Sequence, residues 1–561
     1  MRFPLISVLL LYTGAALAQS SPYNYQVTKY MTPRRYAVVS AHPLASEAGA
    51  QVMKAGGNAV DAAIATQLAL AVVYPEAGNL GGGGFMVARL RNGQSLAIDY
   101  REMAPQKAHR DMYLDGNGNA QTRLSLDGHL AAGVPGTVAG LFASHQYAKL
   151  PFAKLVAPAI KLAEKGFVIT EREAAGLNRR KEDFIRLNTM PTAFVKDTPW
   201  KAGDTLVQKD LARTLRLIAQ KGAAGFYEGE TAEKVVAEMR RGGGIISAAD
   251  LKGYRAKPRQ PLQFKFRGYD ILTMPLPSSG GVGIQQMLGM VESYPLEEWG
   301  FHSVQSVQVM IEAERRAYAD RAKFLGDPDF TSPPLAAITQ PSYLKTRMQT
   351  FTPGRATPSE AVQAGLVKES MQTTHLSVLD ADGNAVSVTT TLNGGYGSKV
   401  VVGGAGFLLN NEMDDFSVKP GTPNMYGLIG AEANAIAPRK RMLSSMTPTI
   451  VLQHNRPVLI AGTPGGSTII TSVFQTILNA LVFNLDAQTT VNAPKFHHQW
   501  LPDEVRIEQD FPDSTRAALE KMGYKFVKSG PWSRTEVIKI HPDGKIEAVG
   551  DKRGDDSAAG E

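Results

Sequence analysis

Four short segments rich in hydroxyl groups, carboxylates and glycine are the places where this chain could do chemistry. Gln-Thr-Thr-His occupies residues 372–375, and Asn-Asn-Glu-Met-Asp-Asp occupies 410–415. Leu-Ser-Ser occupies 443–445, and Gly-Thr-Pro-Gly-Gly-Ser precedes an apolar stretch at 462–467. Backbone N–H groups at such a glycine-rich helix start can bind an anion or a developing oxyanion. Taken singly, each segment is more typical of a turn, so the chemistry depends on their coming together.

Several common catalytic signatures are missing from the sequence. It has no cysteine, which removes thiol nucleophiles and thiolate metal sites. It has neither a Gly-x-Ser-x-Gly nucleophile elbow nor a His-Glu-x-x-His zinc helix. The adjacent His497 and His498 could suggest a metal, but neighbouring side chains diverge both on a strand and on a helix. We therefore expect buried or hydrogen-bonded histidines, no metal and no cofactor.

The clearest secondary-structure signal near these segments is a hairpin. Two alternating stretches, 374–380 and 384–392, flank Ala-Asp-Gly, which suits a three-residue loop with Gly383 in the left-handed region. In that register Thr373 lies opposite Thr391, on the same face of the ladder. A two- or four-residue loop would shift the pairing by one residue.

The rest of the chain must supply the layers that hold this hairpin. A buried helix is predicted at Ala59–Val73. The glycine run at 78–84 is interpreted as a structural loop before a strand, because no Lys-Ser/Thr follows it. The middle of the chain, about 150–369, is predicted to be largely helical, with a Pro- and Ser-rich loop at 275–281 that opens a helix. Within it, Val307–Lys323 is expected to form an amphipathic helix with a solvated charged face.

Length, charge and the first residues bound the class of protein. The 561 residues are 43% apolar and 20% charged, as in ordinary globular proteins, and allow three or four domains or one large fold. The net charge of +8 is slight and there is no long basic run, so nucleic-acid binding is not expected. Residues 1–18 combine a basic start, a short apolar core and Ala-Leu-Ala. This predicts a secretory signal peptide cleaved after Ala18 rather than a membrane span.

Together and in this order, the segments resemble the gamma-glutamyltranspeptidase family of N-terminal nucleophile hydrolases. The resemblance covers essentially the mature chain. It includes Gly-Gly-Asn-Ala-Val-Asp-Ala from Gly56, Tyr-Arg-Glu-Met-Ala-Pro from Tyr100 and Ala-Gly-Val-Pro-Gly-Thr from Ala132. It implies an α/β (α+β) fold, a four-layer αββα sandwich formed jointly by two fragments of one precursor. The large fragment is 19–372 and the small fragment is 373–561.

The resemblance also implies roles for individual residues. The precursor cuts itself between Gln372 and Thr373, and Thr373 then acts as nucleophile, with its new α-amine, of pKa about 8, as the base. Thr391 hydrogen-bonds the nucleophile, and the backbone of Gly465 and Gly466 forms the oxyanion hole. The implied substrate-binding residues are Arg101, Ser444 and Ser445 for an α-carboxylate, Asn393, Glu412 and Asp415 for an α-ammonium, and Tyr426 in a loop at 420–430 that covers the pocket.

The activity implied is cleavage of the γ-glutamyl amide bond of glutathione and related compounds, with transfer to water or to an amino acid or dipeptide. The expected location is the periplasm or the outside of the cell. The close alternative is an amidase or acylase of the same architecture, such as a glutaryl-type β-lactam acylase. Arg101 with Asp415 favours an α-amino acid, because a group lacking the ammonium would leave Asp415 unpaired. The alternative from another class is an exported binding protein that does not cleave itself.

Overall fold

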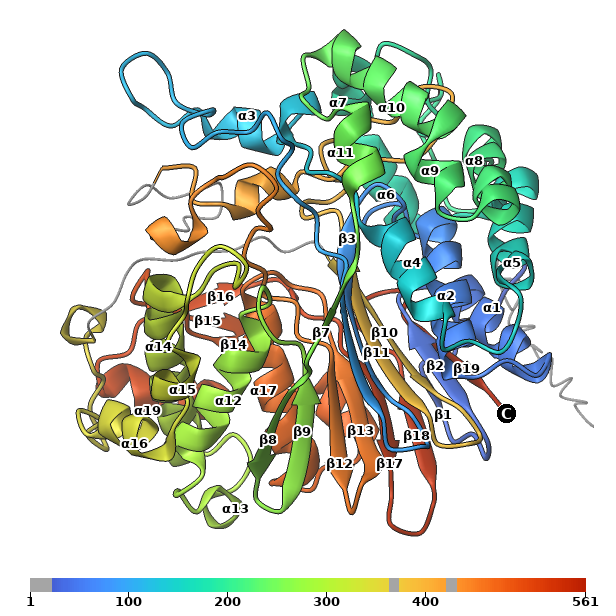
Figure 1. The fold of residues 1–561 in the computed structure, drawn as a ribbon. Helices are drawn as coiled ribbons and strands as arrows, with labels where there is room; N and C mark the ends of the chain where they lie inside the picture. The colour runs from blue at the N-terminus through green and yellow to red at the C-terminus, as the bar shows by residue number, and fades with distance from the viewer. Residues whose placement is uncertain (1–22, 363–372, 420–430) are drawn as a thin grey trace, which may run out of the picture.

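Two seven-stranded antiparallel sheets stack face to face, with helices on both outer sides (Figure 1). The computed structural model describes residues 23–362, 373–419 and 431–561, and every structural statement below refers to these ranges. The predicted signal peptide at 1–18, Gln372 and Tyr426 lie outside the described residues.

Both sheets contain strands from before and after Thr373. In spatial order the first sheet consists of β1 (Tyr30–Met31), β18 (Ile546–Val549), β17 (Glu536–Ile540), β13 (Arg456–Gly462), β12 (Thr449–Gln453), β9 (Tyr269–Thr273) and β8 (Leu262–Phe266). The second consists of β19 (Ser557–Gly560), β2 (Ala37–Ser40), β10 (Thr373–Leu379), β11 (Ala385–Thr391), β3 (Gly83–Arg89), β4 (Ser95–Asp99) and β7 (Lys257–Arg259). Two small sheets are formed by β14 (Phe496–His497), β15 (Val505–Glu508) and β16 (Phe526–Ser529), and by β5 (Phe167–Val168) and β6 (Thr205–Leu206).

The helices divide into two groups along the chain. The first group, of which α1 and α2 cover the second sheet, is α1 (Pro43–Lys54), α2 (Ala59–Val73), α3 (Thr122–Leu126), α4 (Thr137–His145), α5 (Phe152–Lys165), α6 (Glu171–Arg179), α7 (Lys181–Leu187), α8 (Lys209–Lys221), α9 (Ala224–Tyr227), α10 (Gly229–Gly242) and α11 (Ala248–Gly253). The second group, of which α12 and α17 cover the first sheet, is α12 (Gly280–Val291), α13 (Leu296–Trp299), α14 (Val304–Phe324), α15 (Leu335–Ile338), α16 (Pro341–Met348), α17 (Thr468–Leu481), α18 (Ala487–Asn492) and α19 (Asp513–Lys521). Within the described ranges, no helix is both long and apolar enough to span a membrane.

Alternate residues of the central strands face opposite layers, as the two-residue period of a strand requires. On β3, Met86 and Ala88 belong to the apolar cluster shared with α1 and α2. Phe85 and Val87 belong to the cluster shared with the first sheet. Both faces of the second sheet are therefore covered, and the predicted αββα sandwich is confirmed.

The predicted buried helix is α2, with the same bounds. Asn58 begins it by accepting hydrogen bonds from the backbone N–H groups of Val60 and Asp61, and Asp61 accepts one from Asn58 in return. Each of its residues is buried, so tertiary packing stabilises this helix on all sides.

The hairpin of β10 and β11 has the predicted register. Thr373 pairs with Thr391 and Leu379 pairs with Ala385, while Gly383 in the loop has a φ of 84°. Hydrogen bonds to β2 and to β3 place this hairpin in the middle of the second sheet.

The glycine run before β3 is a structural loop, as predicted. A Cβ on Gly82 would lie 2.1 Å from the carbonyl oxygen of Thr391, and one on Gly84 would lie 2.5 Å from that of Thr389. Only glycine allows the backbone of β3 to approach the end of β11 so closely.

The prediction that the charged face of the Val307–Lys323 helix is exposed to solvent is wrong. Helix α14 lies among α12, α16 and α19, and it buries the charged side chains Glu312, Glu314, Arg315, Arg316, Asp320 and Arg321. Burial is possible because these groups are paired inside the protein: Arg316 forms an ion pair with Glu312, and the backbone N–H of His498 donates to Glu314 at 2.8 Å.

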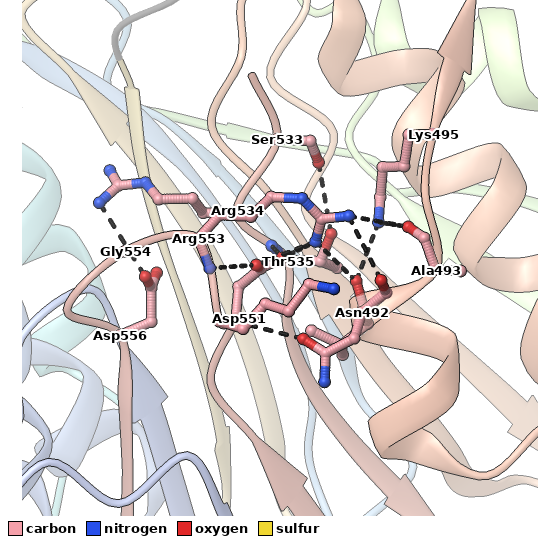
Figure 2. A network of polar contacts seen from close by, with 12 residues as sticks. Asn492, Ala493, Lys495, Ser533, Arg534, Thr535, Asp551, Arg553, Gly554 and Asp556 are labelled. Carbon is pink, nitrogen blue, oxygen red and sulfur yellow. Dashed lines mark hydrogen bonds and ion pairs between the residues drawn. The ribbon is translucent and has the colours of Figure 1, made fainter. Parts of the chain in front are cut away.

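A polar network ties the C-terminal segment to the rest of the molecule. In Figure 2 the guanidinium of Arg553 lies between Asp551 and the backbone carbonyl of Ala493, to which it donates at 3.0 and 2.8 Å. Beside it, the backbone N–H of Arg534 donates to Thr463 Oγ1 at 3.1 Å, just ahead of the predicted oxyanion loop. The segment that leads into β17 therefore contacts the start of that loop.

Candidate active site

A small pocket opens where the first residue of β10 and the last residue of β11 lie opposite each other. Its cavity volume is about 20 Å³, far below the roughly 300–1,000 Å³ that is usual for ligand sites, so the lining side chains nearly fill it. The residues that line it are Arg101, Thr373, Thr391, Asn393, Glu412, Asp415, Ser444, Ser445, Met446, Gly466 and Ile469. All except Met446 and Ile469 were predicted for the site from the sequence.

The two threonines are held by backbone contacts at the strand ends. Thr391 Oγ1 accepts a hydrogen bond of 2.8 Å from the backbone N–H of Asn393, whose φ of 70° turns the chain away from the sheet. The Nδ2 of Asn79 donates to the carbonyl oxygen of Thr391 at 2.8 Å. These two hydrogen bonds fix Thr391 beside its cross-strand partner Thr373. Thr373 itself is buried, at 5% exposure.

The glycine pair forms a sharp turn between β13 and α17. Gly465 and Gly466 have φ values of 139° and 60°, and a Cβ on Gly465 would lie 2.4 Å from Thr468 Oγ1. Only glycine fits this backbone, which delivers the N-terminus of α17 to the pocket. Gly466 lines the pocket together with Thr373, and Gly465 directly precedes it in the chain.

The positively charged side of the pocket is Arg101, two residues beyond the end of β4. Its guanidinium forms ion pairs with Glu412 and Asp415, and its Nη1 lies 3.6 Å from Glu102 Oε2. Its backbone N–H donates to Asp99 at 3.0 Å, which fixes the turn out of the strand. One buried guanidinium therefore faces three buried carboxyl groups.

Burial, together with the neighbouring charges, shifts the pKa of every member of the cluster. Burial raises the pKa of Glu102 to about 7, although Arg101 opposes the shift. Burial and the neighbouring Glu102 raise the pKa of Glu412 well above its usual range, and burial raises that of Asp415. Burial would lower the pKa of Arg101, but the attraction of Glu412 and Asp415 outweighs burial and raises it. The pKa values of all three carboxyl groups are therefore raised in the folded protein, mainly by burial.

The Ser444–Ser445 pair also lines the pocket. Ser444 Oγ accepts from the backbone N–H of Met446 at 3.2 Å, and Ser445 Oγ accepts from Nη2 of Arg321 at 3.2 Å. Sequence reasoning gave no role to Arg321, because it assigned the charges of α14 to solvent.

Sequence reasoning also gave no role to Glu102. It is fully buried, and no hydrogen-bond donor reaches either of its side-chain oxygens within the described ranges. Its position next to Arg101 in a strand-end segment was the available signal.

The paired histidines are structural, as predicted. His497 makes hydrogen bonds of 2.9 Å with Thr471 and with Gln499, and His498 lies 3.3 Å from Asp503. Burial lowers the pKa of His497 to about 3 and that of His498 to about 4. Both are therefore neutral at physiological pH, and among the described residues no group of three His, Asp or Glu side chains could hold a metal ion.

The fold and this pocket together define a class of enzyme. An αββα sandwich with a threonine at the start of a central strand, facing a glycine-rich helix start, is the architecture of the N-terminal nucleophile hydrolases. The chain belongs to the gamma-glutamyltranspeptidase family, whose model matches residues 45–561.

Individual relatives agree with the family assignment. The chain is 45% identical over 559 residues to a glutathione hydrolase proenzyme of Escherichia coli (strain K12), a match that covers 98% of this chain and 96% of that protein. Among solved structures, a cephalosporin acylase from Bacillus halodurans is similar with a TM-score of 0.84 at 25% identity, covering 97% of this chain and 98% of its own. A gamma-glutamyltranspeptidase chain from Helicobacter pylori has a TM-score of 0.56 at 44% identity and covers 58% of this chain and 94% of its own.

The carboxyl cluster generates a prediction about pH. Because the pKa of Glu102 is raised from 4.5 to about 7, the folded protein holds more protons than the unfolded chain in this window, and stability falls as pH rises through it. Glu412→Gln removes one interacting carboxyl group and should make the fall in melting temperature between about pH 4.5 and 7 shallower. Thermal unfolding of both proteins across this range measures the slope. Glu298→Gln, at an exposed position, is the control, and an unchanged slope in Glu412→Gln contradicts the raised pKa of Glu412.

Proposed function

We propose that the chain is an exported, self-cleaving enzyme that breaks the γ-glutamyl amide bond of glutathione and related compounds and transfers the glutamyl group to water, amino acids or dipeptides. One observation carries the proposal. The in-register Thr373–Thr391 pair opens onto a pocket that also contains Arg101, Asp415 and the Ser444–Ser445 pair. Membership of the gamma-glutamyltranspeptidase family supports the same activity.

Self-cleavage follows from the chemistry of a threonine held next to its own peptide bond. The Oγ1 of Thr373 attacks the carbonyl carbon of Gln372, and the acyl group moves from nitrogen to oxygen. Water then opens the ester, which leaves a carboxylate on Gln372 and a free α-amine on Thr373. With a pKa of about 8, this amine can accept the proton of the hydroxyl in the next step.

Turnover uses the same hydroxyl on the substrate. The Oγ1 of Thr373 attacks the γ-carbonyl carbon, its proton passes to the α-amine, and backbone N–H groups of Gly465 and Gly466 stabilise the oxyanion. The leaving amine takes the proton, and a γ-glutamyl ester remains on Thr373. Water or an acceptor amine then attacks the ester carbonyl and restores the threonine hydroxyl.

The charges of the pocket suit the zwitterionic end of a γ-glutamyl group. The planar fork of Arg101 and the hydroxyls of Ser444 and Ser445 are donors for the α-carboxylate. The carboxyl groups of Glu412 and Asp415, with Asn393 beside them, are acceptors for the α-ammonium. The sum of these contacts selects an L-α-amino acid with its amide at the γ position.

The acylase alternative uses the same fold but a different head group. A glutaryl group has a carboxylate and no ammonium, so it would bring no positive charge to the three carboxyl groups that already share Arg101. A binding protein that does not cleave itself is the other alternative. The rate of release from a γ-glutamyl anilide, measured with and without a dipeptide acceptor, tests the proposal: no release contradicts it.

Two further parts of the proposal concern processing and location. Removal of residues 1–18 during export would leave a mature chain in the periplasm or outside the cell. Cleavage before Thr373 would then give a heterodimer of residues 19–372 and 373–561 from one precursor, and the name proenzyme of the Escherichia coli relative supports such processing.

The cut itself can be tested with one substitution. Wild type should give two bands on a denaturing gel, and N-terminal sequencing of the smaller band should begin at Thr373. Thr373→Ala should stay intact and inactive, because it lacks the attacking hydroxyl. Thr374→Ala is the matched control, since Thr374 pairs with Thr390 on the opposite face, and it should be cleaved. A smaller fragment that begins elsewhere contradicts the assignment.

The partner threonine should affect processing and turnover alike. Thr391→Ala removes the hydroxyl beside the nucleophile and should slow both by the equivalent of about 0.5–1.5 kcal/mol or more. Thr391→Ser should be milder because the hydroxyl survives. Thr389 lies one pair further along on the same face and hydrogen-bonds His375 at 2.9 Å, so Thr389→Ala serves as control. Single-turnover processing and steady-state rates measure the effect, and equal damage from both alanines in folded protein would count against it.

The two ends of the head group should respond to different substitutions. Asp415→Asn should lower kcat/KM for a γ-glutamyl anilide more than for a glutaryl anilide, because only the former has an ammonium. Arg101→Lys keeps the charge but loses the fork, and should weaken both substrates by about 1–3 kcal/mol in transition-state binding. The measured quantity is kcat/KM for each substrate and variant. Equal losses of kcat/KM for the two substrates in Asp415→Asn would contradict a contact between Asp415 and the ammonium.

A further inference from the structure

The Ser444–Ser445 pair is held from behind by the loop before α12, which the sequence analysis singled out without giving it a role. The backbone N–H and the Oγ of Ser279 both donate to the carbonyl oxygen of Ser444, each at 2.7 Å. The backbone N–H of Ser444 donates to the carbonyl oxygen of Pro277 at 2.9 Å. The two loops are therefore fixed to each other along a short parallel bridge.

Arg321 of α14 connects this loop to the pocket. Its Nε donates to Ser279 Oγ at 2.7 Å, and its Nη2 donates to Ser445 Oγ at 3.2 Å. The side chain is almost fully buried, at 4% exposure. Burial lowers its pKa to about 10, against the attraction of Tyr318 and Asp415, so Arg321 remains a cation at neutral pH.

These contacts use both serine oxygens as hydrogen-bond acceptors. A hydroxyl group has one proton to donate. The oxygen of Ser445 accepts from Arg321, and the oxygen of Ser444 accepts from the backbone N–H of Met446. Each serine oxygen thus accepts a hydrogen bond on its protein side, which helps to fix the side chain. Since both side chains line the pocket, they lie within reach of an anion bound there.

The charges of the pocket also indicate that an incoming carboxylate needs positive charge beyond that of Arg101. Both Nη atoms of Arg101 already contact carboxyl groups, Glu412 on one and Asp415 on the other. An incoming carboxylate would therefore meet a guanidinium whose charge is largely compensated. Arg321 supplies a second buried cation on the serine side, where hydrogen bonds to charged groups are strongest.

We propose that Arg321 is a positioning and specificity-determining residue, which acts through Ser445 to select ligands with an α-carboxylate. The inference rests on the proposed function, because it takes a γ-glutamyl compound as the ligand. Arg321 itself does not need to touch the substrate. It fixes the acceptor side of Ser445, joins it to the Ser279 loop and adds positive potential at the carboxylate.

The test compares two ligands that differ only in the carboxylate. L-glutamate and 4-aminobutyrate share the ammonium and the γ-carboxyl group, but 4-aminobutyrate lacks the α-carboxylate. Calorimetric Kd values for both should be measured on processed wild type, Arg321→Gln and Arg321→Lys. Arg321→Gln should weaken L-glutamate about tenfold to a hundredfold and change 4-aminobutyrate by less than about twofold. Arg321→Lys should lie between, because it keeps the charge and loses the fork.

Kinetics and a double variant separate positioning from general damage. For a γ-glutamyl anilide, Arg321→Gln should raise KM with a smaller change in kcat, since the contact is made to a part of the substrate that does not react. In a Ser445→Ala background, Arg321→Gln should add little, because the two residues act as one unit. Arg316→Lys is the matched control: Arg316 is buried on the same helix but contacts Glu312 and the carbonyl of Arg347.

The outcomes are distinct. Equal weakening of both ligands, full additivity with Ser445→Ala, or the same effect from Arg316→Lys overturns the role of Arg321. If Arg321→Gln does not fold, the Arg321→Lys and Ser445→Ala arms decide by the same ligand ratio. A wild-type enzyme that does not prefer L-glutamate over 4-aminobutyrate contradicts the proposed function, and the role of Arg321 with it. A preference that survives in Arg321→Lys and Arg321→Gln contradicts only the inference.

Discussion

The pairing of β10 with β11 is the constraint on which the rest of the site depends. It brings Thr373 and Thr391 together at one end of a central hairpin, and a slip of one residue would turn one of the two threonines to the other face of the sheet. Neighbouring strands on both sides fix the register, and the glycines of the 78–84 run let β3 approach without a clash. Because β4 pairs with β3, the turn that carries Arg101 is delivered to the same end of the sheet.

The second constraint on the site is electrostatic: the guanidinium of Arg101 lies among the carboxyl groups of Glu102, Glu412 and Asp415. Three buried carboxyl groups share one guanidinium, an arrangement that is costly unless a proton or another positive charge compensates it. A zwitterionic ligand brings such a charge in its ammonium group. Under the proposed function, the ammonium would lie beside carboxyl groups whose pKa values are raised, so substrate binding and the protonation of Glu102 and Glu412 are coupled.

Local patterns predicted the elements that depend on local chemistry. The hairpin followed from its three-residue loop and the alternation on both sides, and α2 followed from its apolar sequence. The burial of α14 could not be predicted in this way, since it depends on three other helices distant in sequence. A hint was present: at about 100° per residue, Glu312, Glu314 and Arg321 cannot share one face of a helix. The site residues came from the resemblance, while Glu102 and Arg321 became visible only when packing showed what they contact.

The second sheet mixes strands from before and after Thr373, and this order affects refolding and the lifetime of the folded enzyme. In the order β19, β2, β10, β11 and β3, the first, third and fourth strands follow Thr373 in sequence and the others precede it. After a cut before Thr373, both fragments would still contribute hydrogen-bonded strands to each sheet. Neither fragment could dissociate without unfolding both sheets. Once unfolded, the pieces would have to find each other again by diffusion. The intact polypeptide would then be the only efficient route to the fold, and the lifetime of the mature enzyme would be set by how slowly it opens rather than by an equilibrium.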